Sequence, residues 1–254
     1  VVIKNCNIRN NTADEYGGGI YFLSSSTTLT NCNFNNNTAV KRGGGIYFHS
    51  SNSILSNCNF ENNNANNQHG GGMYWTGTSG TLTDCVIIDN TASEGAGITF
   101  ESSSPTLTNC IIKNNTSLYS GGGGIKCQSS NPILTNCIIS GNTANEGIGG
   151  GIFFKQSTPT LTNCRIENNI SLRGGGIFCD IASPTFTSCI IEGNIASSTS
   201  LEHGNGGGLY VGNNSSPSLV GCTIANNMAN NGGGVHCQDN NSNLVITNCM
   251  IIAN

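Results

Sequence analysis

The feature that most constrains this chain is a cysteine that returns ten times, at nearly constant spacing, within an apolar and asparagine-rich phrase. The phrase reads LTNCNFNNNT at 29–38, LTNCIIKNNT at 107–116 and LTNCIISGNT at 134–143. Successive spacings are 26, 26, 27, 25, 27, 27, 25, 33 and 27 residues. The repeating cysteines are Cys6, Cys32, Cys58, Cys85, Cys110, Cys137, Cys164, Cys189, Cys222 and Cys249. Such a period indicates stacked repeats, each burying its apolar side against its neighbours.

Each repeat favours strands and tight turns over helix. The residues three before and two after each cysteine are apolar, as Leu107 and Ile112 are around Cys110, and nine repeats carry GGG or GAG. Glycine runs and Asn-Thr clusters oppose helix, whereas alternation after the cysteine is typical of strands. We therefore predict an all-β fold, a right-handed parallel β-helix of about ten coils of 25–27 residues. Residues 1–254 are expected to form one β-helix domain, a segment of a longer solenoid.

An asparagine lies five residues after every repeating cysteine, which makes it the most regular position in the chain. Its amide both donates and accepts hydrogen bonds, so in-register copies ~4.8 Å apart predict a ladder along the solenoid. The predicted ladder contains Asn11, Asn37, Asn63, Asn90, Asn115, Asn142, Asn169, Asn194, Asn227 and Asn254.

The cysteines are predicted to form a parallel internal column of small buried thiols. Stacked in-register neighbours are close enough for a disulfide but rarely have the required torsion. The interior of that column is expected to consist of Cys32, Cys58, Cys85, Cys110, Cys137, Cys164 and Cys189.

Two kinds of turn are also predicted. Leu107 and Cys110 are three residues apart, so a bend must fall between them, where Asn109 precedes the cysteine. A glycine triplet such as Gly43–Gly45 predicts backbone with positive φ that is too crowded for a Cβ. A phosphate-binding loop does not fit these triplets, because no lysine directly follows any of them and no helix is predicted after them.

The composition argues against several functional classes. Only 9% of the residues are charged and the net charge is −4, without a Lys/Arg cluster, so nucleic-acid binding is not expected. No apolar stretch is long enough for a membrane-spanning helix. The four histidines and thirteen cysteines lack the usual metal-ligand spacings, so neither a metal site nor a cofactor is expected.

The repeats resemble a known family of surface proteins. GGGI followed by FNNN (34–37) or FENN (60–63) is similar to the GGAI and FxxN repeats of the chlamydial polymorphic outer membrane proteins. Those repeats form exported β-helical passenger domains linked to adhesion. The resemblance implies an extracellular or cell-surface location and glycan or protein partners on a host or neighbouring cell.

Clustered catalytic residues are not evident in the sequence. Asp14, Asp84, Asp89 and Asp180 are scattered over different repeat positions. Glu167 and Glu192 form the best carboxylate pair, because both lie three residues after a cysteine on consecutive coils. Adjacent carboxylates can act as an acid/base pair, but two solvated side chains are the expected arrangement here. No residue is therefore assigned a catalytic role.

Two other features are candidate binding surfaces. The longest insertion, IASSTSLEHGN at 195–205, contains Glu202 and His203, and insertions in solenoids gather at one edge where partners often bind. An outward Thr-x-Thr array resembles the ice-binding face of antifreeze β-solenoids. Its members include Thr83, Thr108, Thr162 and Thr187.

The expected function is a non-catalytic structural or adhesive role, at a cell surface or after secretion. The alternatives are a β-helix that binds or cleaves polysaccharide, and ice binding through the threonine array. The open strand edges at the ends of the chain also predict end-to-end self-association, or continuation into further coils.

Overall fold

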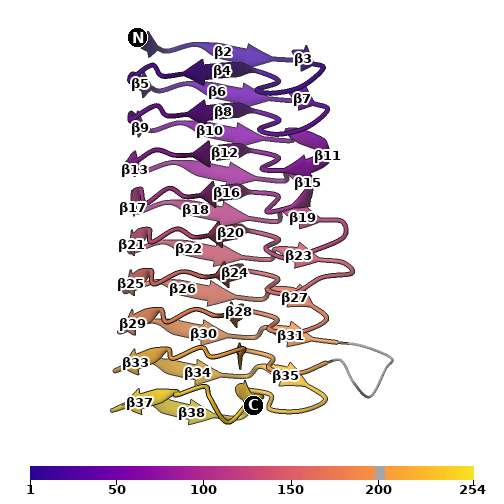
Figure 1. Ribbon diagram of the computed structural model, residues 1–254, viewed down its shortest axis with the longest axis vertical. Helices are drawn as coiled ribbons and strands as arrows, with labels where there is room; N and C mark the ends of the chain where they lie inside the picture. Colours follow the sequence, from indigo (N-terminus) through magenta and orange to yellow (C-terminus); the bar gives the residue numbers. More distant parts are fainter. Residues whose placement is uncertain (198–203) are drawn as a thin grey trace.

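The structure is a computed structural model that describes residues 1–197 and 204–254. In this part of the chain the strands β1 to β38 wind into a parallel β-solenoid without helix, which confirms the predicted fold (Figure 1). Every strand pairs in parallel with its counterpart one coil away. Nine coils are followed by the first two strands of a tenth. We name the four sheets A to D. The coils are numbered from 1 to 10 in chain order, and each begins at its sheet A strand, so that β1 begins coil 1 and β5 begins coil 2.

Sheets A and B flank the repeating cysteine. Sheet A consists of β1 (Val2–Lys4), β5 (Thr27–Thr30), β9 (Ser53–Ser56), β13 (Gly80–Thr83), β17 (Thr106–Thr108), β21 (Ile133–Thr135), β25 (Thr160–Thr162), β29 (Thr185–Thr187), β33 (Ser218–Val220) and β37 (Val245–Thr247). Sheet B consists of β2 (Asn7–Arg9), β6 (Asn33–Asn35), β10 (Asn59–Glu61), β14 (Val86–Ile88), β18 (Ile111–Lys113), β22 (Ile138–Ser140), β26 (Arg165–Glu167), β30 (Ile190–Glu192), β34 (Thr223–Ala225) and β38 (Met250–Ile252).

Sheets C and D complete each coil. Sheet C consists of β3 (Thr12–Ala13), β7 (Thr38–Ala39), β11 (Asn64–His69), β15 (Thr91–Glu94), β19 (Thr116–Ser117), β23 (Thr143–Ala144), β27 (Ile170–Ser171), β31 (Ile195–Ala196) and β35 (Met228–Ala229). Sheet D consists of β4 (Ile20–Leu23), β8 (Ile46–His49), β12 (Met73–Thr76), β16 (Ile98–Glu101), β20 (Ile125–Gln128), β24 (Ile152–Lys155), β28 (Ile177–Asp180), β32 (Leu209–Gly212) and β36 (Val235–Cys237).

The asparagine ladder forms as predicted at the corner between sheets B and C. The Asn115 side chain donates from Nδ2 to Asn142 Oδ1 (2.9 Å) and to the Ile87 carbonyl (3.0 Å), while its Oδ1 accepts from Asn90. The ladder residues from Asn37 to Asn227 are at most 2% exposed. Each amide therefore satisfies backbone groups of its own and adjacent coils, which holds successive coils in register.

The cysteine column is also present, and all thirteen cysteines are free thiols. The Cys110 thiol donates to the carbonyls of Thr108 and Leu82, both at 3.5 Å. Cys127 and Cys179, which face the core from sheet D, are fully buried, and burial raises the pKa of both thiols. The buried cysteines therefore act as small apolar core residues.

The glycines of each triplet are required for two different reasons, a positive φ at the first and a lack of space for a Cβ at the other two. Gly43 has φ of +68°, whereas Gly44 and Gly45 have ordinary φ values but no room for a side chain. A Cβ on Gly44 would lie 2.4 Å from the Asn64 carbonyl oxygen, and one on Gly45 would lie 2.5 Å from the Gly72 oxygen. The predicted positive φ thus applies to the first glycine, and crowding against the adjacent coil explains the other two.

The interior is one continuous apolar core, and it is open at the final coil. Ile224 on coil 9 is completely buried, whereas Ile251, at the same position on coil 10, is 50% exposed. End-to-end association through such surfaces stays a prediction.

Candidate functional site

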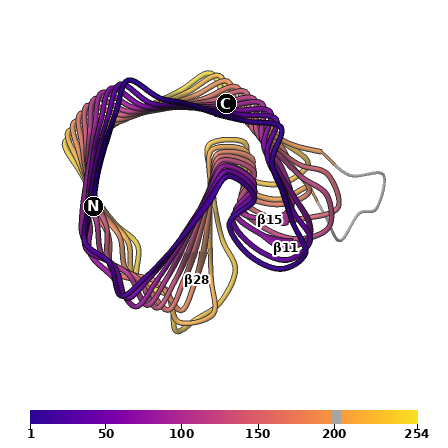
Figure 2. The same cartoon turned by 90° about the horizontal axis from the view of Figure 1, so that it is seen from above.

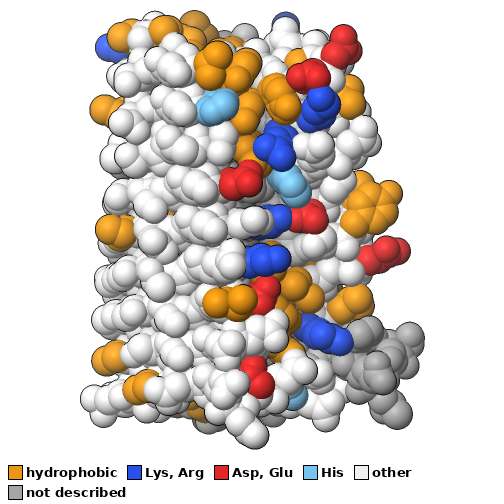
Figure 3. Space-filling view, viewed as in Figure 1, with side chains coloured by type: hydrophobic (Ala, Val, Ile, Leu, Met, Phe, Trp, Pro, Cys, Tyr) orange, Lys and Arg blue, Asp and Glu red, His pale blue; other side chains and the backbone are white. Residues whose placement is uncertain are grey.

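The connections from sheet C to sheet D differ most between coils. Figure 2 shows them bulging away from the solenoid and folding back beside sheet D. Side chains of these connections pack on the outer face of sheet D along the length of the molecule. We call this line of contact the seam. On the face drawn in Figure 3, charged and histidine side chains gather in a band rather than spreading evenly.

Sheet D contributes two outward columns to the seam, because each of its strands alternates inward and outward residues. The first, the seam column, is mostly buried and consists of Tyr21, Tyr47, Tyr74, Thr99, Lys126, Phe153, Phe178, Tyr210 and His236. The second, the rim row, is half-buried on six consecutive coils and consists there of His49, Thr76, Glu101, Gln128, Lys155 and Asp180.

Tyrosine rings stack at the start of the seam. The rings of Tyr21 and Tyr47 are stacked with centroids 5.0 Å apart, and Tyr74 meets Tyr47 edge-on at 5.1 Å. Tyr16, from a connection, packs on Tyr47 at 5.1 Å. Tyr21 remains 40% exposed, while Tyr47 and Tyr74 are buried. Burial raises the pKa of the Tyr47 hydroxyl, so this ring is neutral. The tyrosine stack is thus mostly covered, and the Tyr21 ring is its exposed end beside the rim row.

A cation, a phenol and a carboxylate meet on coils 2 to 4. The Arg42 guanidinium lies 5.0 Å from the Tyr74 ring centroid, and its Nη1 is 3.8 Å from Glu101 Oε2. The Tyr74 hydroxyl donates to the same carboxylate oxygen. Arg42 also donates from Nε to Gln68 Oε1 at 2.8 Å. These contacts hold the Glu101 carboxylate beside the buried end of the tyrosine stack, where the carboxylate itself is 37% exposed.

A second charged cluster follows on coils 3 to 5. Lys126 Nζ donates to Glu94 Oε2, and His69 Nδ1 lies 3.5 Å from that oxygen. Burial lowers the pKa of His69 to about 4, and the nearby Lys126 charge contributes. Burial disfavours ionised Glu94, but Lys126 and His69 outweigh it and lower the pKa of this carboxyl group. At neutral pH the cluster therefore contains a neutral imidazole beside a carboxylate paired with an ammonium group.

The seam column becomes apolar beyond coil 5. The rings of Phe178 and Tyr210 stack at 4.4 Å, Phe153 meets Phe178 edge-on at 5.7 Å, and Tyr210 stacks on His236 at 5.1 Å. Ile148 from a connection packs on this group. Burial, with a smaller contribution from Arg173, lowers the pKa of His236.

The site residues predicted from the sequence lie elsewhere. Glu167 and Glu192 are register partners on the outer face of sheet B, as expected. Arg165 Nη2 lies 2.7 Å from Glu167 and 4.0 Å from Glu192, so a shared cation accompanies the pair. Glu202 and His203 lie outside the described residues.

The predicted threonine array lies on the outer face of sheet A. Thr83 pairs in register with Thr108, and Thr162 pairs with Thr187, all half-buried. The array is therefore separate from the seam.

Sequence reasoning missed the seam, although a signal for it exists. The second and fourth residues after each glycine triplet vary widely in chemistry, while the first and third residues are always apolar. Variation at a fixed register position indicates a column whose residue types are not required by the fold. The sheet C strands and the connections after them vary in length, which hides which of their residues reach sheet D. Arg42, His69 and Glu94 could therefore not be paired with this column in advance.

Comparison with known proteins identifies the family. Residues 1–149, 69–205 and 144–254 match the family described as right handed beta helix region. The chain belongs to this family. No curated protein matches the sequence significantly. Within the β-helix family the finer resemblance to polymorphic membrane proteins stays a prediction.

Several solved β-helices have a similar fold. The pectate lyase Pel9A shares 13% identity at a TM-score of 0.60, with 99% of this chain and 68% of that chain covered. The periplasmic alginate epimerase AlgG and the A-module of the Azotobacter vinelandii mannuronan C-5 epimerase AlgE6 each share 11% identity at a TM-score of 0.44. Both alignments cover 99% of this chain and 74% of the other. At 13% identity, the similarity to Pel9A is one of fold.

In the described part of the chain, no helix has the length and apolar character needed to cross a membrane. Within the same ranges, no three metal-ligating side chains converge.

Proposed function

We propose that the chain is a polysaccharide-binding β-helix and that the glycan lies along the seam. The observation that carries this proposal is the rim row. Six consecutive coils present six different hydrogen-bonding side chains in register, and the exposed ring of Tyr21 lies at one end of this row. A solenoid places one such side chain every ~4.8 Å, a repeat comparable to the length of one sugar residue.

The chemistry of the seam fits a sugar polymer. Hydroxyl groups donate and accept hydrogen bonds, and the rim row offers donors such as Lys155 and acceptors such as Glu101. The apolar faces of sugar rings pack on aromatic side chains, and Tyr21 is the exposed end of the tyrosine stack. The similarity in fold to a pectate lyase, whose name states that it acts on pectate, supports a polysaccharide ligand.

This proposal takes up the polysaccharide alternative in place of the adhesive stalk. A stalk needs only the buried columns, whereas the varied rim row and its pairing with the connections serve no structural repeat. An extracellular or cell-surface location fits a protein that binds polysaccharide.

The proposal is tested by affinity electrophoresis and calorimetry of the full chain with soluble polygalacturonate, alginate and a neutral glucan. At least one polymer should bind, and Glu101→Ala or Lys155→Ala should weaken binding about tenfold, as expected for a lost charge-assisted hydrogen bond. Glu192→Ala, on the outer face of sheet B, is the matched control and should bind like the original chain. Unchanged binding by both seam variants, or no binding to any of the three polymers, would contradict the proposal.

The same mixtures can be assayed for new chain ends. His69 is a neutral base and Arg42 and Lys126 are cations, so the seam contains groups that could take part in cleavage. Release of oligosaccharides would add catalysis to binding.

A second candidate function rests on sheet A. Its second outward column has a hydroxyl on seven consecutive coils, which are Thr30, Ser56, Thr83, Thr108, Thr135, Thr162 and Thr187. Outward positions of the sheet A strands between β5 and β33 carry no charge. This neutral row of hydroxyl groups in register is the feature that resembles the ice-binding face of antifreeze β-solenoids.

Ice binding is tested by thermal hysteresis of the full chain. Activity that is abolished by Thr108→Lys and retained by Lys113→Gln, on the adjacent sheet, would support it. Absence of hysteresis at high protein concentration would remove it.

A further inference from the structure

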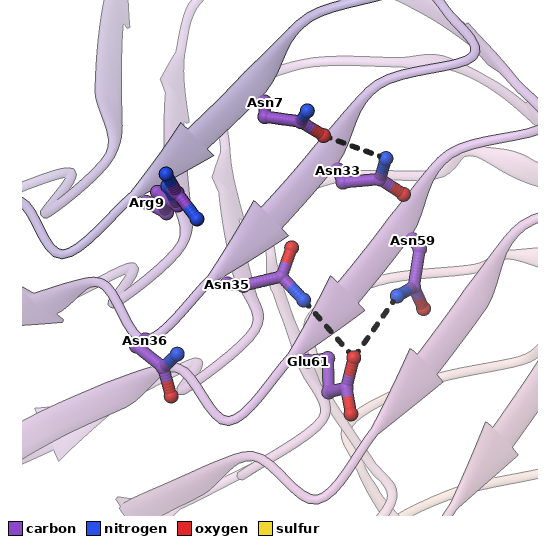
Figure 4. Close-up of a pocket in the computed structure, with 7 residues that line it drawn as sticks. All are labelled: Asn7, Arg9, Asn33, Asn35, Asn36, Asn59 and Glu61. Carbon is purple, nitrogen blue, oxygen red and sulfur yellow. Dashed lines mark hydrogen bonds between the residues drawn. The ribbon is translucent and has the colours of Figure 1, made fainter.

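The outer face of sheet B has a polar depression of about 480 Å³ over coils 1 to 3. It is lined by Asn7, Arg9, Asn33, Asn35, Asn36, Asn59 and Glu61 (Figure 4). Strands β2, β6 and β10 supply all of these except Asn36, which follows β6. Register pairing arranges them as two columns, with three asparagines in one and Arg, Asn and Glu in the other. The volume lies within the range of small-molecule sites.

The internal hydrogen bonds fix the direction of several amides. Asn33 donates to Asn7 Oδ1 at 2.9 Å, and Asn35 and Asn59 donate to Glu61 Oε2 at 3.0 and 3.3 Å (Figure 4). The Asn7 amide keeps its donors, while Asn33, Asn35 and Asn59 keep their carbonyl oxygens as acceptors. The depression thus presents fixed donors and acceptors side by side, which is the pattern that adjacent sugar hydroxyls require.

The charges lie at opposite ends of the array. Arg9 is on coil 1 and Glu61 is on coil 3, so about two strand spacings, ~10 Å, separate their positions. In residues 1–197 and 204–254, no carboxylate lies within ion-pairing distance of Arg9, whereas Glu61 already accepts two amide hydrogen bonds. An exposed guanidinium prefers an anion, and a carboxylate can bind it through two parallel hydrogen bonds.

The depression has a defined boundary. On coil 4, Val86 pairs with Asn59 and Ile88 pairs with Glu61, so both polar columns end in apolar side chains. These side chains can contact the C–H face of a sugar ring. A ligand about two sugar residues long (~10 Å) would span the array from Arg9 to Glu61, and a third sugar residue would reach this apolar edge.

We propose that this amide array is a second carbohydrate site, which binds an acidic disaccharide with its carboxylate on Arg9 and its hydroxyl groups on the asparagines. The site is on sheet B and does not depend on the seam. The site can therefore be confirmed or rejected independently of glycan binding along the seam.

The test uses the full chain and two matched probes, digalacturonate and its methyl ester, whose carboxyl groups are uncharged. Isotope-labelled protein is titrated and followed by amide chemical shifts. The acid should bind more tightly than the ester, with shifts at the side-chain amides of Asn33, Asn35 and Asn59. Equal affinity of acid and ester, or no shift at these amides up to millimolar ligand, would overturn the proposal.

Variants separate this site from its surroundings. Arg9→Gln should weaken binding of the acid about tenfold or more and leave the ester unaffected, because only the charge-assisted contact is lost. Lys113→Gln, in the same outward column on coil 5, is the matched control and should have no effect. Glu101→Gln alters the seam and should also leave digalacturonate binding at the array unchanged. If Arg9→Gln and Lys113→Gln behave alike, the assignment to Arg9 is wrong.

Discussion

Two parts of the seam have the same backbone but different chemistry. On coils 2 to 5, Tyr74 and Lys126 meet Arg42, Glu101 and Glu94 in two charged clusters. On coils 6 to 8, Phe153, Phe178 and Tyr210 form a buried aromatic group.

Strand bounds and register continue from one part to the other without interruption. Each outward side chain contacts mainly its own and the adjacent coils, so a solenoid tolerates a local change in chemistry without a change in fold. The seam column is therefore where function can vary.

The asparagine ladder should behave identically beside both parts of the seam. Asn115→Ala and Asn194→Ala each remove a buried amide that bonds to both neighbouring coils and leave backbone groups unsatisfied. We expect each substitution to lower the free energy of unfolding by about 4 kcal/mol, measured by urea denaturation. Asn145→Ala, at an exposed position, is the control and should change it by less than about 0.5 kcal/mol. Clearly unequal losses at Asn115 and Asn194 would show that the scaffold differs between the two parts.

The aromatic part should depend on packing. Phe178→Ala removes a ring that contacts Phe153 and Tyr210, and the resulting cavity should lower the free energy of unfolding by about 3 kcal/mol. The loss should be the same in low and high salt, because no charge is involved. Phe178→Leu is the milder control, expected to cost about half as much. A loss that depends strongly on salt would contradict the apolar description of this part.

The charged part should depend on pH through His69. Its folded pKa, about 4, is below its ordinary value of 6.5, so the unfolded chain binds the proton first as pH falls. The contribution of His69 to the free energy of unfolding is therefore complete above pH 6.5 and is lost as pH falls towards 4. The change should reach about 2–3 kcal/mol.

Urea denaturation across this range should show a shallower pH dependence for His69→Gln than for the original chain. Lowering of the Glu94 pKa acts in the same direction but below the ordinary carboxyl value of 4.5, so the two groups separate. Identical pH profiles for the chain and the variant would rule out His69 as the source.

Lys126→Met should have the smallest effect of the four. The substitution keeps most of the side-chain volume and removes the contact with Glu94, which is 26% exposed and can gain water. We expect a loss of about 1–2 kcal/mol in the free energy of unfolding. Phe153→Met, one coil further in the same column, is the matched apolar control and should not alter the pH profile. A loss as large as that of Phe178→Ala would show that the ion pair, not packing, holds this part of the seam.

The buried columns could be predicted because the fold imposes them on every coil. Asn142 must bond to the coils on both sides, and Gly44 has no room for a Cβ. The same requirement applies at the equivalent position of every coil, so the same residue type repeats in the sequence. The carboxylate pair Glu167 and Glu192 was correctly placed in register for the same reason. Its partner Arg165 lies two positions earlier on the same strand, and the regular alternation puts it on the same face.

The seam could not be predicted, because it joins residues whose spacing is not periodic. His69 and Glu94 end strands of sheet C, whereas Lys126 lies in sheet D, yet His69 and Lys126 both lie beside Glu94. The folding of each connection back onto sheet D decides which side chains meet there.

The sequence by itself determined the solenoid, its period, the asparagine ladder and the thiol column. These depend on contacts between identical positions one coil apart, which repeat in the sequence and can be counted. Only the tertiary structure decided where Arg42, Tyr74 and Glu101 meet, and that Arg9 and Glu61 stand at opposite ends of an asparagine array. Such contacts depend on the path of irregular connections and on which outward columns become neighbours, and neither leaves a period in the sequence.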